Sequence, residues 1–160
     1  MPKKVKEPQP PTGLARLLYR FPILMFRLGM GSAMGSRFLL LNHTGRKSGL
    51  PRQVVLEVVH YDEASSTYFV AAGFGPRSDW YQNLLNNPAA SIQVARQEQN
   101  IMAHLCSQKE ATQVLEVYAN KHPRAASALA KYMGYETDGS SDDFAALGNI
   151  LEVIRLDPID

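Results

Sequence analysis

The residues best suited to chemistry in this chain form a short, positively charged turn. Arg46, Lys47 and Ser48 lie between Gly45 and Gly49, and Arg52 follows in the sequence Thr-Gly-Arg-Lys-Ser-Gly-Leu-Pro-Arg. A tight turn bounded by glycines directs backbone N–H groups outward, and the side chains add positive charge and a hydroxyl group. This combination fits a phosphate group. The spacing differs from the P-loop pattern Gly-x-x-x-x-Gly-Lys-Ser/Thr, so we expect an anion site of another kind.

A second candidate site lies in residues 73–88, Gly-Phe-Gly-Pro-Arg-Ser-Asp-Trp-Tyr-Gln-Asn-Leu-Leu-Asn-Asn-Pro. We expect a short helix capped by Asp79, with Trp80, the only tryptophan, in its first turn. The amides of such a turn can bind an anion or a ring carbonyl, and Trp80 can form an aromatic wall beside it. Trp80 is equally suited to anchoring the helix in the core, and Asp79 fits an N-cap better than a catalytic acid.

The charge of the chain is distributed unevenly. The formal net charge is +2, but residues 1–52 contain ten Lys or Arg residues and one acidic residue, whereas residues 53–160 contain seven basic and fourteen acidic residues. A basic block of this kind predicts an anionic partner such as a nucleic acid, lipid headgroups or a phosphorylated small molecule.

The length and composition narrow the class of protein. A chain of 160 residues with 45% apolar residues can bury one sizeable core without disulfides or a structural metal. Cys106 is the only cysteine, which excludes an internal disulfide and a Cys-x-x-Cys metal site and favours a reduced, cytoplasmic protein. The apolar stretch at residues 21–26 is far shorter than the ~20 residues that a membrane-spanning helix needs.

The N-terminal region divides into an arm and a helix. Residues 1–12 contain four prolines and three lysines and predict a disordered arm, so that residues 13–160 form a single domain. Apolar residues at helical spacing from Leu14 to Leu28, with arginines on the other side, predict an amphipathic helix that Pro22 kinks or restarts. This helix is expected either to cover one end of the core or to lie on an anionic membrane.

Short strands dominate the rest of the chain. Strands are predicted at residues 37–44, 53–61, 67–73, 91–96, 100–106 and 149–156. Helices are predicted at residues 79–86, from the Ser107 capping box to the His122-Pro123 break, and from there to about Met133, with a polar loop at residues 137–143. Six strands without βαβ alternation predict an α+β protein built on a mainly antiparallel barrel and argue against a Rossmann fold.

In this order and spacing, the motifs resemble the deazaflavin-dependent nitroreductase and quinone reductase family. The resemblance rests on Arg-Phe-Leu-Leu-Leu, Thr-Gly-Arg-Lys-Ser-Gly-x-x-Arg, Ala-Ala-Gly and Ser-Asp-Trp-Tyr-x-Asn-Leu-x-x-Asn-Pro, and it is dense over residues 37–96. It implies a six-stranded FMN-binding split β-barrel that holds a reduced deazaflavin (coenzyme F-420). It also implies an oxidoreductase that transfers hydride to a small electron-poor acceptor such as a quinone or a nitroaromatic compound.

The same resemblance implies the binding residues. It assigns the phosphate and glutamate tail of the coenzyme to Arg46, Lys47, Ser48 and Arg52. The residues that it places around the ring are Val54, Val55, Leu56, Ala71, Ala72, Gly73, Asp79, Trp80, Tyr81 and Asn83. No metal ligand is implied, and no side chain is assigned as a catalytic acid or base because the coenzyme carries the chemistry.

This chain departs from the family pattern at several positions. Members commonly have Ser or Thr at the position of His43 and Pro at the position of Val55. After the third strand, some members have a Ser-Lys pair where this chain has Gly73-Phe74. Ala125 and Ala128 stand where quinone-reducing members carry tyrosines.

Other functions remain open at the level of sequence. An FMN-dependent reductase needs only one phosphate at the turn, and a non-catalytic carrier of a flavin-like ligand would suit the missing tyrosines. A nucleic-acid-binding barrel is less favoured, because the strands lack exposed aromatic residues interleaved with Arg or Lys. We expect a small-molecule acceptor and no nucleic acid as partner, and the resemblance leaves room for a homodimer and for a peripheral membrane contact through the N-terminal helix.

Overall fold

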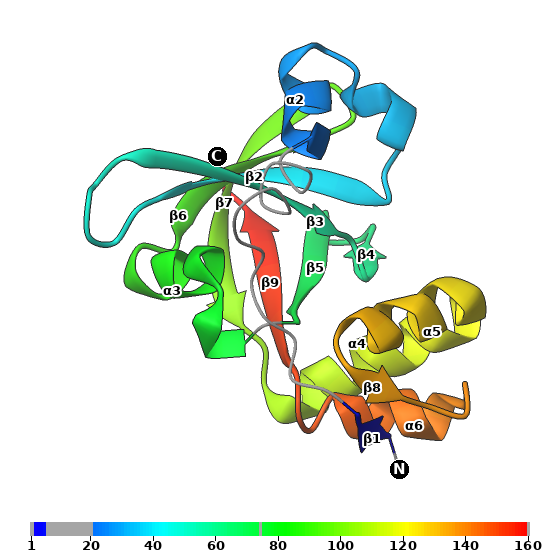
Figure 1. Cartoon of the computed structure of the whole chain (residues 1–160). Helices are drawn as coiled ribbons and strands as arrows, with labels where there is room; N and C mark the ends of the chain where they lie inside the picture. Colours follow the sequence, from blue (N-terminus) through cyan, green and yellow to red (C-terminus); the bar gives the residue numbers. More distant parts are fainter. Residues whose placement is uncertain (1, 6–20, 74, 160) are drawn as a thin grey trace.

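The computed structural model describes residues 2–5, 21–73 and 75–159 of the chain (Figure 1). Its strands are β1 (Lys3–Lys4), β2 (Phe38–Thr44), β3 (Pro51–Glu57), β4 (His60–Asp62), β5 (Thr67–Ala72), β6 (Ala89–Val94), β7 (Gln97–Leu105), β8 (Tyr135–Glu136) and β9 (Glu152–Pro158). Its helices are α2 (Phe21–Arg27), α3 (Asp79–Asn86), α4 (Gln108–Lys121), α5 (Pro123–Tyr132) and α6 (Ser141–Leu147), with 3-10 turns η1 (Gly31–Met34) and η2 (Gly75–Arg77).

Seven strands form one curled antiparallel sheet in the order β3-β2-β6-β7-β9-β5-β4. The predicted α+β class and antiparallel barrel-like sheet are therefore confirmed. Among the described residues, β3 pairs with β2 alone, so the other edge of β3 carries no strand. Figure 1 shows that the curl of the sheet brings β3, at one end of the strand order, back to the side of β5, near the other end.

The strand count differs from the six strands predicted, because the segment predicted at residues 53–61 is two strands. After Glu57 the backbone bends: the Val58 amide donates to the Arg37 carbonyl (2.8 Å), whereas the Val59 amide donates to the Phe69 carbonyl (2.9 Å). The chain thus changes partner from β2 to β5 within two residues. The valine-rich sequence of residues 54–59 gave no sign of this change of partner.

The predicted β6–β7 hairpin is present, but its turn lies earlier than expected. β6 ends at Val94 and β7 begins at Gln97, so the turn is formed by Ala95 and Arg96 and not by residues 97–99. Ala95 has a φ of 53°, a left-handed conformation that is unusual for alanine.

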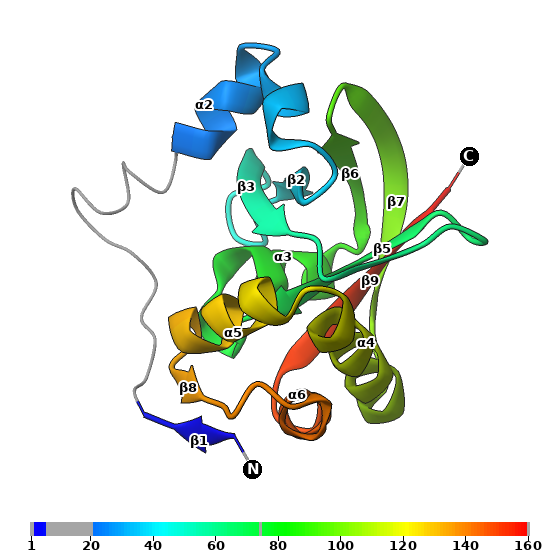
Figure 2. The same cartoon turned by 90° about the vertical axis from the view of Figure 1, so that its right-hand side faces the viewer.

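The C-terminal helices pack together on one side of the sheet (Figure 2). The Ser107 hydroxyl accepts from the Glu110 amide (3.1 Å), which confirms the predicted cap of α4, and Pro123 begins α5 as predicted. Helix α6 is a correction to the predicted polar loop at residues 137–143. The Ser140 hydroxyl accepts from the Asp143 amide (3.2 Å) and caps this helix, so the last strand begins only at Glu152.

The described N-terminal residues belong to two places in the fold. Lys3 and Lys4 pair antiparallel with Glu136 and Tyr135, so this part of the predicted disordered arm is a short strand. Helix α2 begins at Phe21 with Pro22 in its first turn, consistent with a restart there, and residues 14–20 of the predicted helix lie outside the described residues.

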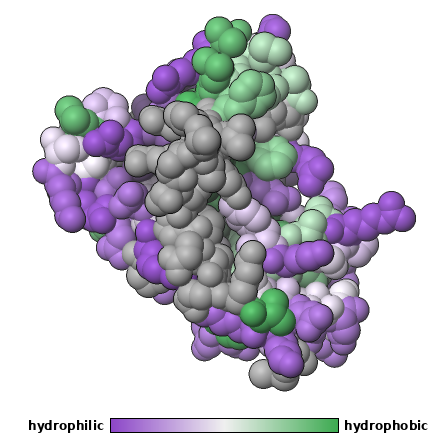
Figure 3. Space-filling view, in the orientation of Figure 1, coloured by the Kyte–Doolittle hydropathy of each residue, from purple (hydrophilic) through white to green (hydrophobic). Residues whose placement is uncertain are grey.

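Helix α2 covers part of the core as expected, but the face that it buries differs from the apolar stripe that the sequence predicts, which included Phe21 and Leu28. Ile23 and Phe26 are buried against the sheet, whereas Phe21, Leu24 and Leu28 are 60%, 47% and 66% exposed. Apolar surface gathers over this helix at the top of Figure 3. In the described part of the chain, no helix is both long and apolar enough to cross a membrane.

Two apolar clusters support the sheet. One lies inside the curl and contains Leu39, Val70, Trp80 and Ile154. The other joins the sheet to α4, α5 and α6. The edge of β3 that faces away from β2 lies next to the first cluster, and the candidate site lies along this edge.

Candidate functional site

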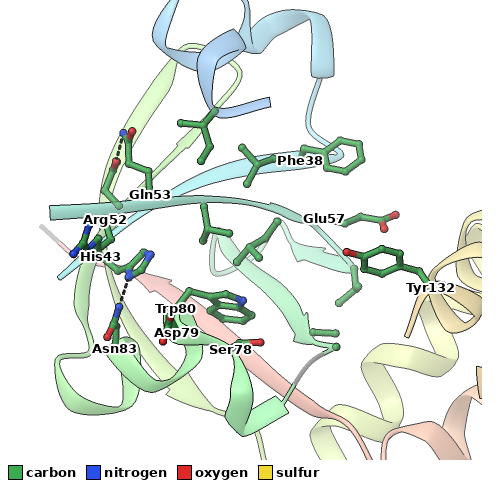
Figure 4. A pocket seen from close by; sticks show the side chains of 18 of the residues that line it. Phe38, His43, Arg52, Gln53, Glu57, Ser78, Asp79, Trp80, Asn83 and Tyr132 are labelled. Atoms are coloured by element: carbon green, nitrogen blue, oxygen red, sulfur yellow. Dashed lines mark hydrogen bonds between the residues drawn. The ribbon is translucent and has the colours of Figure 1, made fainter. Parts of the chain in front are cut away.

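A cavity of about 1280 Å³ lies between β3, the end of β5, α3 and α5 (Figure 4). All seven residues of β3 line it, although neighbouring residues of a strand point to opposite faces. This is possible because the cavity follows the edge of β3 that pairs with no strand of the described residues. A ligand here would lie along a row of backbone donors and acceptors.

The two faces of β3 present different surfaces to this cavity. Val54 and Leu56 face the inside of the curl, where they pack against the cluster that contains Trp80. Val55 faces the opposite side and packs against Ile23 and Phe26 of α2. The three residues predicted to lie together under a ring therefore all line the cavity, but from both sides of the strand.

A chain of hydrogen bonds fixes the outer side of β3. The Arg27 guanidinium donates to Gln53 Oε1 (2.8 Å from Nε), and Gln53 Nε2 donates to Asn42 Oδ1 (2.8 Å). Asn42 Nδ2 in turn donates to Ser91 Oγ (3.1 Å). These side chains connect α2 to β3, β2 and β6, so hydrogen bonds on the outer face of the sheet fix the position of the β3 edge that lines the cavity.

The glycine-bounded turn between β2 and β3 closes on itself. The Gly45 amide donates to the Leu50 carbonyl (2.9 Å), and the Gly49 amide donates to the Gly45 carbonyl (2.8 Å). Gly49 has a φ of 70°, and a Cβ atom on Gly45 would lie 2.5 Å from Ser48 Oγ. The positive φ of Gly49 favours glycine there, whereas a side chain at residue 45 would require only the Ser48 hydroxyl to rotate away.

Arg46 connects this turn to α3. Its backbone amide and its Nη1 each donate to Asn83 Oδ1 (both 3.0 Å), and its guanidinium contacts Asp79 Oδ1 at 3.3 Å. Lys47 and Arg52 make no ion pair with any described residue, and both side chains line the cavity. Of the three predicted cations, two thus remain available to an anion, while Arg46 already has partners in the protein.

His43 lies beside this network on the inner side of β2. Its side chain is 7% exposed, and its Nδ1 lies 3.0 Å from Asn83 Nδ2. Burial lowers the pKa of His43 to about 4; nearby Asp79 opposes this shift and Arg52 adds to it. His43 is therefore neutral at physiological pH.

The N-terminus of α3 differs from the expectation in one residue. Ser78, not Asp79, occupies the N-cap position, and its side chain makes no capping hydrogen bond. The Ser78 residue is 4% exposed, and its Oγ is buried without a hydrogen-bond partner among the described residues. Asp79 is exposed and pairs with Arg46. A buried hydroxyl without a partner is unfavourable, and Ser78 lines the cavity, so its Oγ is available to hydrogen-bond with a bound molecule.

The far end of the cavity is formed by the end of β5 and by α5. A Cβ atom on Gly73 would lie 3.0 Å from Met133 Cγ, so this glycine allows a close approach of the two segments. Residues of α5 that line the cavity are Ala125, Ala128, Leu129 and Tyr132. The alanines noted in the sequence thus face the cavity directly.

One carboxylate lies at this end. Glu57 accepts a hydrogen bond from the Tyr118 hydroxyl (2.6 Å), and Arg37 Nη2 lies 3.5 Å from its Oε1. Burial, followed by the hydrogen bond to Glu57, raises the pKa of Tyr118. Figure 4 shows Glu57 near Tyr132 at the mouth of the cavity.

The structure gathers most of the residues predicted for the site. Twelve of the fourteen line the cavity, whereas Ala72 and Tyr81 do not and are 1% and 4% exposed in the core. Sequence reasoning did not assign Ser78, Asn42, Gln53 or Glu57 to the site. Gln53 and Glu57 share a face of β3 with Val55, so the alternation of side chains along the strand would have indicated both residues. No local signal indicated that the Ser78 hydroxyl would lack a partner. In the described part of the chain, no group of three or more His, Cys, Asp or Glu side chains is arranged to hold a metal ion.

Comparison with solved structures places the fold among split barrels. A structure named F420-H2 Dependent Reductase (FDR-A) is 22% identical, with a TM-score of 0.53, and the match covers 76% of this chain and 94% of that one. An FMN-binding protein of Nostoc punctiforme, related to pyridoxamine 5'-phosphate oxidase, is 17% identical, with a TM-score of 0.51 and coverage of 88% and 81%. A structure described as a domain-swapped dimer is 18% identical, with a TM-score of 0.54 and coverage of 91% and 100%.

Comparison of sequences identifies the family. A protein of Mycobacterium tuberculosis, provisionally named an F420H(2)-dependent quinone reductase, is 31% identical over 86 residues, which are 52% of this chain and 71% of that protein. The sequence model of the family described as F420H(2)-dependent quinone reductase matches residues 27–137, which include the turn, β3 and α3. Since this match spans well over half of the chain, the protein belongs to the F420H(2)-dependent quinone reductase family and is a deazaflavin-dependent oxidoreductase.

Proposed function

We propose that this protein transfers hydride from a reduced deazaflavin to a small, flat, electron-poor acceptor of the quinone or nitroaromatic type. The observation that carries the proposal is the composition of one continuous cavity. Lys47 and Arg52 lie at its turn end, and Val54, Leu56 and Trp80 form its middle. An anionic tail and a planar ring need this combination of charge and apolar surface.

The residues present fit such a coenzyme. The cavity of about 1280 Å³ exceeds the roughly 300–1,000 Å³ of common small-molecule sites, which leaves room for a ring, a phosphorylated linker and an acceptor. The unpartnered Ser78 hydroxyl, buried beside Trp80 at the start of α3, fits a carbonyl oxygen of the ring edge. Both features are explained by a bound flavin-type molecule.

The chain would bind, orient and enclose the reactants. When bound, the reduced deazaflavin supplies the hydride from C5 of its ring. Lys47 and Arg52 would hold the anionic end, Val54 and Leu56 would support the ring, and Trp80 would exclude water from its far edge. The proton that completes reduction of the acceptor would come from solvent, because His43 is neutral and buried.

The end near α5 is suited to the acceptor. Ala125 and Ala128 present small side chains to the cavity, next to Leu129 and Tyr132. This leaves space for a flat ring with apolar substituents against α5. The ring of the acceptor and the ring of the coenzyme would then lie together in the space between Trp80 and Tyr132.

The activity is tested by mixing the purified protein with reduced deazaflavin and a series of acceptors. We expect a menadione-like quinone or a nitroaromatic compound to accelerate the return of the oxidised chromophore. Lys109 is exposed on α4 and does not line the cavity. The Lys109→Ala variant, which loses one surface charge outside the site, should therefore react at the wild-type rate. No acceleration with any acceptor would refute the proposed reaction.

An FMN-dependent reductase is the second candidate, because the turn requires only one phosphate and a similar fold binds FMN in Nostoc punctiforme. Titration with deazaflavin and with FMN, followed by ring fluorescence, separates the two. Tighter binding of FMN and no binding of deazaflavin would favour the second candidate. Tight binding of either ligand without turnover would indicate a carrier.

Assembly and location are further parts of the proposal. A homodimer is supported by one similar structure that is a domain-swapped dimer, and light scattering of the purified protein tests it.

A cytoplasmic protein with a peripheral membrane contact is the proposed location, and the exposed Phe21, Leu24 and Leu28 of α2 support the membrane contact. Sedimentation with anionic vesicles tests that contact.

A further inference from the structure

The orientation of the Asn83 amide is fixed by the turn. Asn83 Oδ1 accepts two hydrogen bonds from Arg46, one from the backbone amide and one from Nη1 (both 3.0 Å). Because both of these groups are donors, the atom that faces them must be the amide oxygen. The amide nitrogen of Asn83 therefore faces His43, and Asn83 is 3% exposed.

This orientation determines the tautomer of His43. Asn83 Nδ2 can only donate, so His43 Nδ1, at 3.0 Å, must accept and cannot carry a proton. Burial lowers the pKa of His43 to about 4, so the ring is neutral. The single ring proton must then be on Nε2.

The Nε2–H group is directed into the cavity. The two nitrogens of an imidazole ring point in widely different directions, so Nε2 faces away from Asn83, as Figure 4 shows. No described residue hydrogen-bonds to Nε2, and His43 lines the cavity. His43 and Arg52 are directly opposed in the β2–β3 ladder, so their side chains lie on the same face at the turn end.

We propose that His43 is a coenzyme-binding residue whose Nε2–H donates to the ribitol-phosphate linker of the coenzyme, with Asn83 and Arg46 fixing its tautomer. This linker is common to deazaflavin coenzymes and FMN. The inference rests on the proposed function, because it places the linker between the cationic turn and the apolar middle of the cavity. His43 contributes a directed neutral donor there, whereas Lys47 and Arg52 contribute charge.

This role explains features that packing alone leaves open. A residue that only filled space beside β2 would be apolar, as Leu39 and Leu41 are on the same face. A buried imidazole with one nitrogen satisfied from behind and the other facing a cavity is a positioned donor. The same network links the turn to α3, so the donor and the cationic turn are held in one geometry.

The tautomer is tested directly by NMR. In protein labelled with ¹⁵N at histidine, long-range ¹H–¹⁵N spectra at pH 7 are expected to show His43 protonated at Nε2 only. The His122 ring at the surface serves as the internal comparison. In Asn83→Asp the carboxylate would accept from Nδ1, so we expect proton occupancy at Nδ1 in that variant. A wild-type His43 protonated at Nδ1 would overturn the inference.

Binding tests the role itself, with three probes of increasing length: lumichrome (ring only), riboflavin (ring and ribitol) and FMN, together with the phosphorylated deazaflavin. Gln places its amide near the position of Nε2, so His43→Gln retains a donor, whereas His43→Leu removes it. We expect His43→Leu to weaken FMN and deazaflavin binding about tenfold and lumichrome binding less than twofold. His43→Gln should stay within about threefold of the wild-type affinity.

The outcomes separate this inference from the proposed function. An equal loss of affinity for lumichrome and for the phosphorylated ligands in His43→Leu would overturn the linker contact while leaving the reductase intact. Wild-type affinity in His43→Leu would do the same. Failure of the wild-type protein to bind either phosphorylated ligand would overturn the proposed function and this inference with it.

Discussion

Ser78 has the least satisfied side chain at the candidate site. Its hydroxyl is buried, makes no hydrogen bond with the described residues and does not cap α3. Such a group destabilises the free protein and becomes useful only when a ligand supplies the missing acceptor. Its role therefore predicts opposite effects on stability and on binding.

We predict that Ser78→Ala leaves the free protein as stable as the wild type or stabilises it by about 1 kcal/mol, because an unsatisfied group is removed. The same change should weaken ring binding by roughly threefold to tenfold. Thermal melting and fluorescence titration measure the two quantities.

Ser140→Ala is the matched control. The Ser140 hydroxyl caps α6 by accepting from the Asp143 amide (3.2 Å), so its loss should destabilise the protein by about 1 kcal/mol and leave binding unchanged. A Ser78→Ala protein that melts lower and binds normally would show that Ser78 is merely structural.

His43 makes the stability of the free protein depend on pH. Its pKa falls from 6.5 to about 4 on folding, so between these values the unfolded chain binds a proton that the folded protein does not. The free energy of unfolding is therefore unaffected by His43 above pH 6.5, and it decreases as the pH falls toward 4, because only the unfolded chain gains a proton at His43. We predict about 2 kcal/mol of extra loss between pH 7 and pH 5 relative to His43→Gln.

Urea unfolding of both proteins at several pH values measures this difference. His60, whose pKa burial also lowers, is present in both proteins and cancels in the comparison. Parallel pH dependences of the two proteins would contradict the burial of a neutral His43.

At the scale of elements, the β2–β3 turn and α3 act as one unit. Arg46 joins them through Asn83 and Asp79, whereas Lys47 in the turn and Arg52 at the start of β3 line the cavity. The three cations should therefore respond differently to removal. Arg46→Ala is expected to lower both stability and affinity, since it removes the side-chain contacts to Asn83 and Asp79 and leaves only the backbone hydrogen bond to α3.

For Lys47→Ala and Arg52→Ala we predict a tenfold to hundredfold loss of affinity for the whole coenzyme, from the roughly 1.5–3 kcal/mol of a charge-assisted contact. Stability should change by no more than ~0.5 kcal/mol, because both residues are exposed and neither makes an ion pair with a described residue. Titrations at several salt concentrations should also show a shallower salt dependence in each variant.

A ring analogue without the anionic tail provides the control. Its affinity should be almost the same in Lys47→Ala and in the wild-type protein. Equal losses for the analogue and the whole coenzyme in a well-folded variant would contradict a tail-binding role.

The elements show where reasoning from sequence succeeded and where it stopped. The Ser107 cap and the proline at the first position of α5 are local signals, so α4 and α5 were predicted close to their observed ends. The bend after Glu57 depends on a change of partner strand, which no local pattern records. Helix α6 did have a local signal in Ser140 and Asp143, but the polar composition of that stretch favoured a loop.

At the scale of the whole molecule, the antiparallel sheet followed from the order of short strands, and the order of motifs indicated the site. The sequence could not indicate which residues on each element face the cavity. Ala72 and Tyr81 were expected beside the ring, yet both are buried in the core and neither lines the cavity: Ala72 is on the opposite face of β5 from Ala71, and Tyr81 is one helical step around α3 from Trp80. The Ser78 hydroxyl and the His43 tautomer depend on contacts between distant segments.

Within the described part of the chain, β3 pairs with a strand on one edge alone, and its other edge has a consequence for the colloidal behaviour of the protein. An open strand edge is a template on which another chain can add a strand, and here the coenzyme site lies along that edge. The coenzyme would therefore shield the protein from self-association as well as supply its chemistry. We predict that, during storage near 40 °C, saturating FMN or deazaflavin slows the growth of light scattering several-fold. Scattering that grows at the same rate with and without bound ligand would show that this edge is protected in another way.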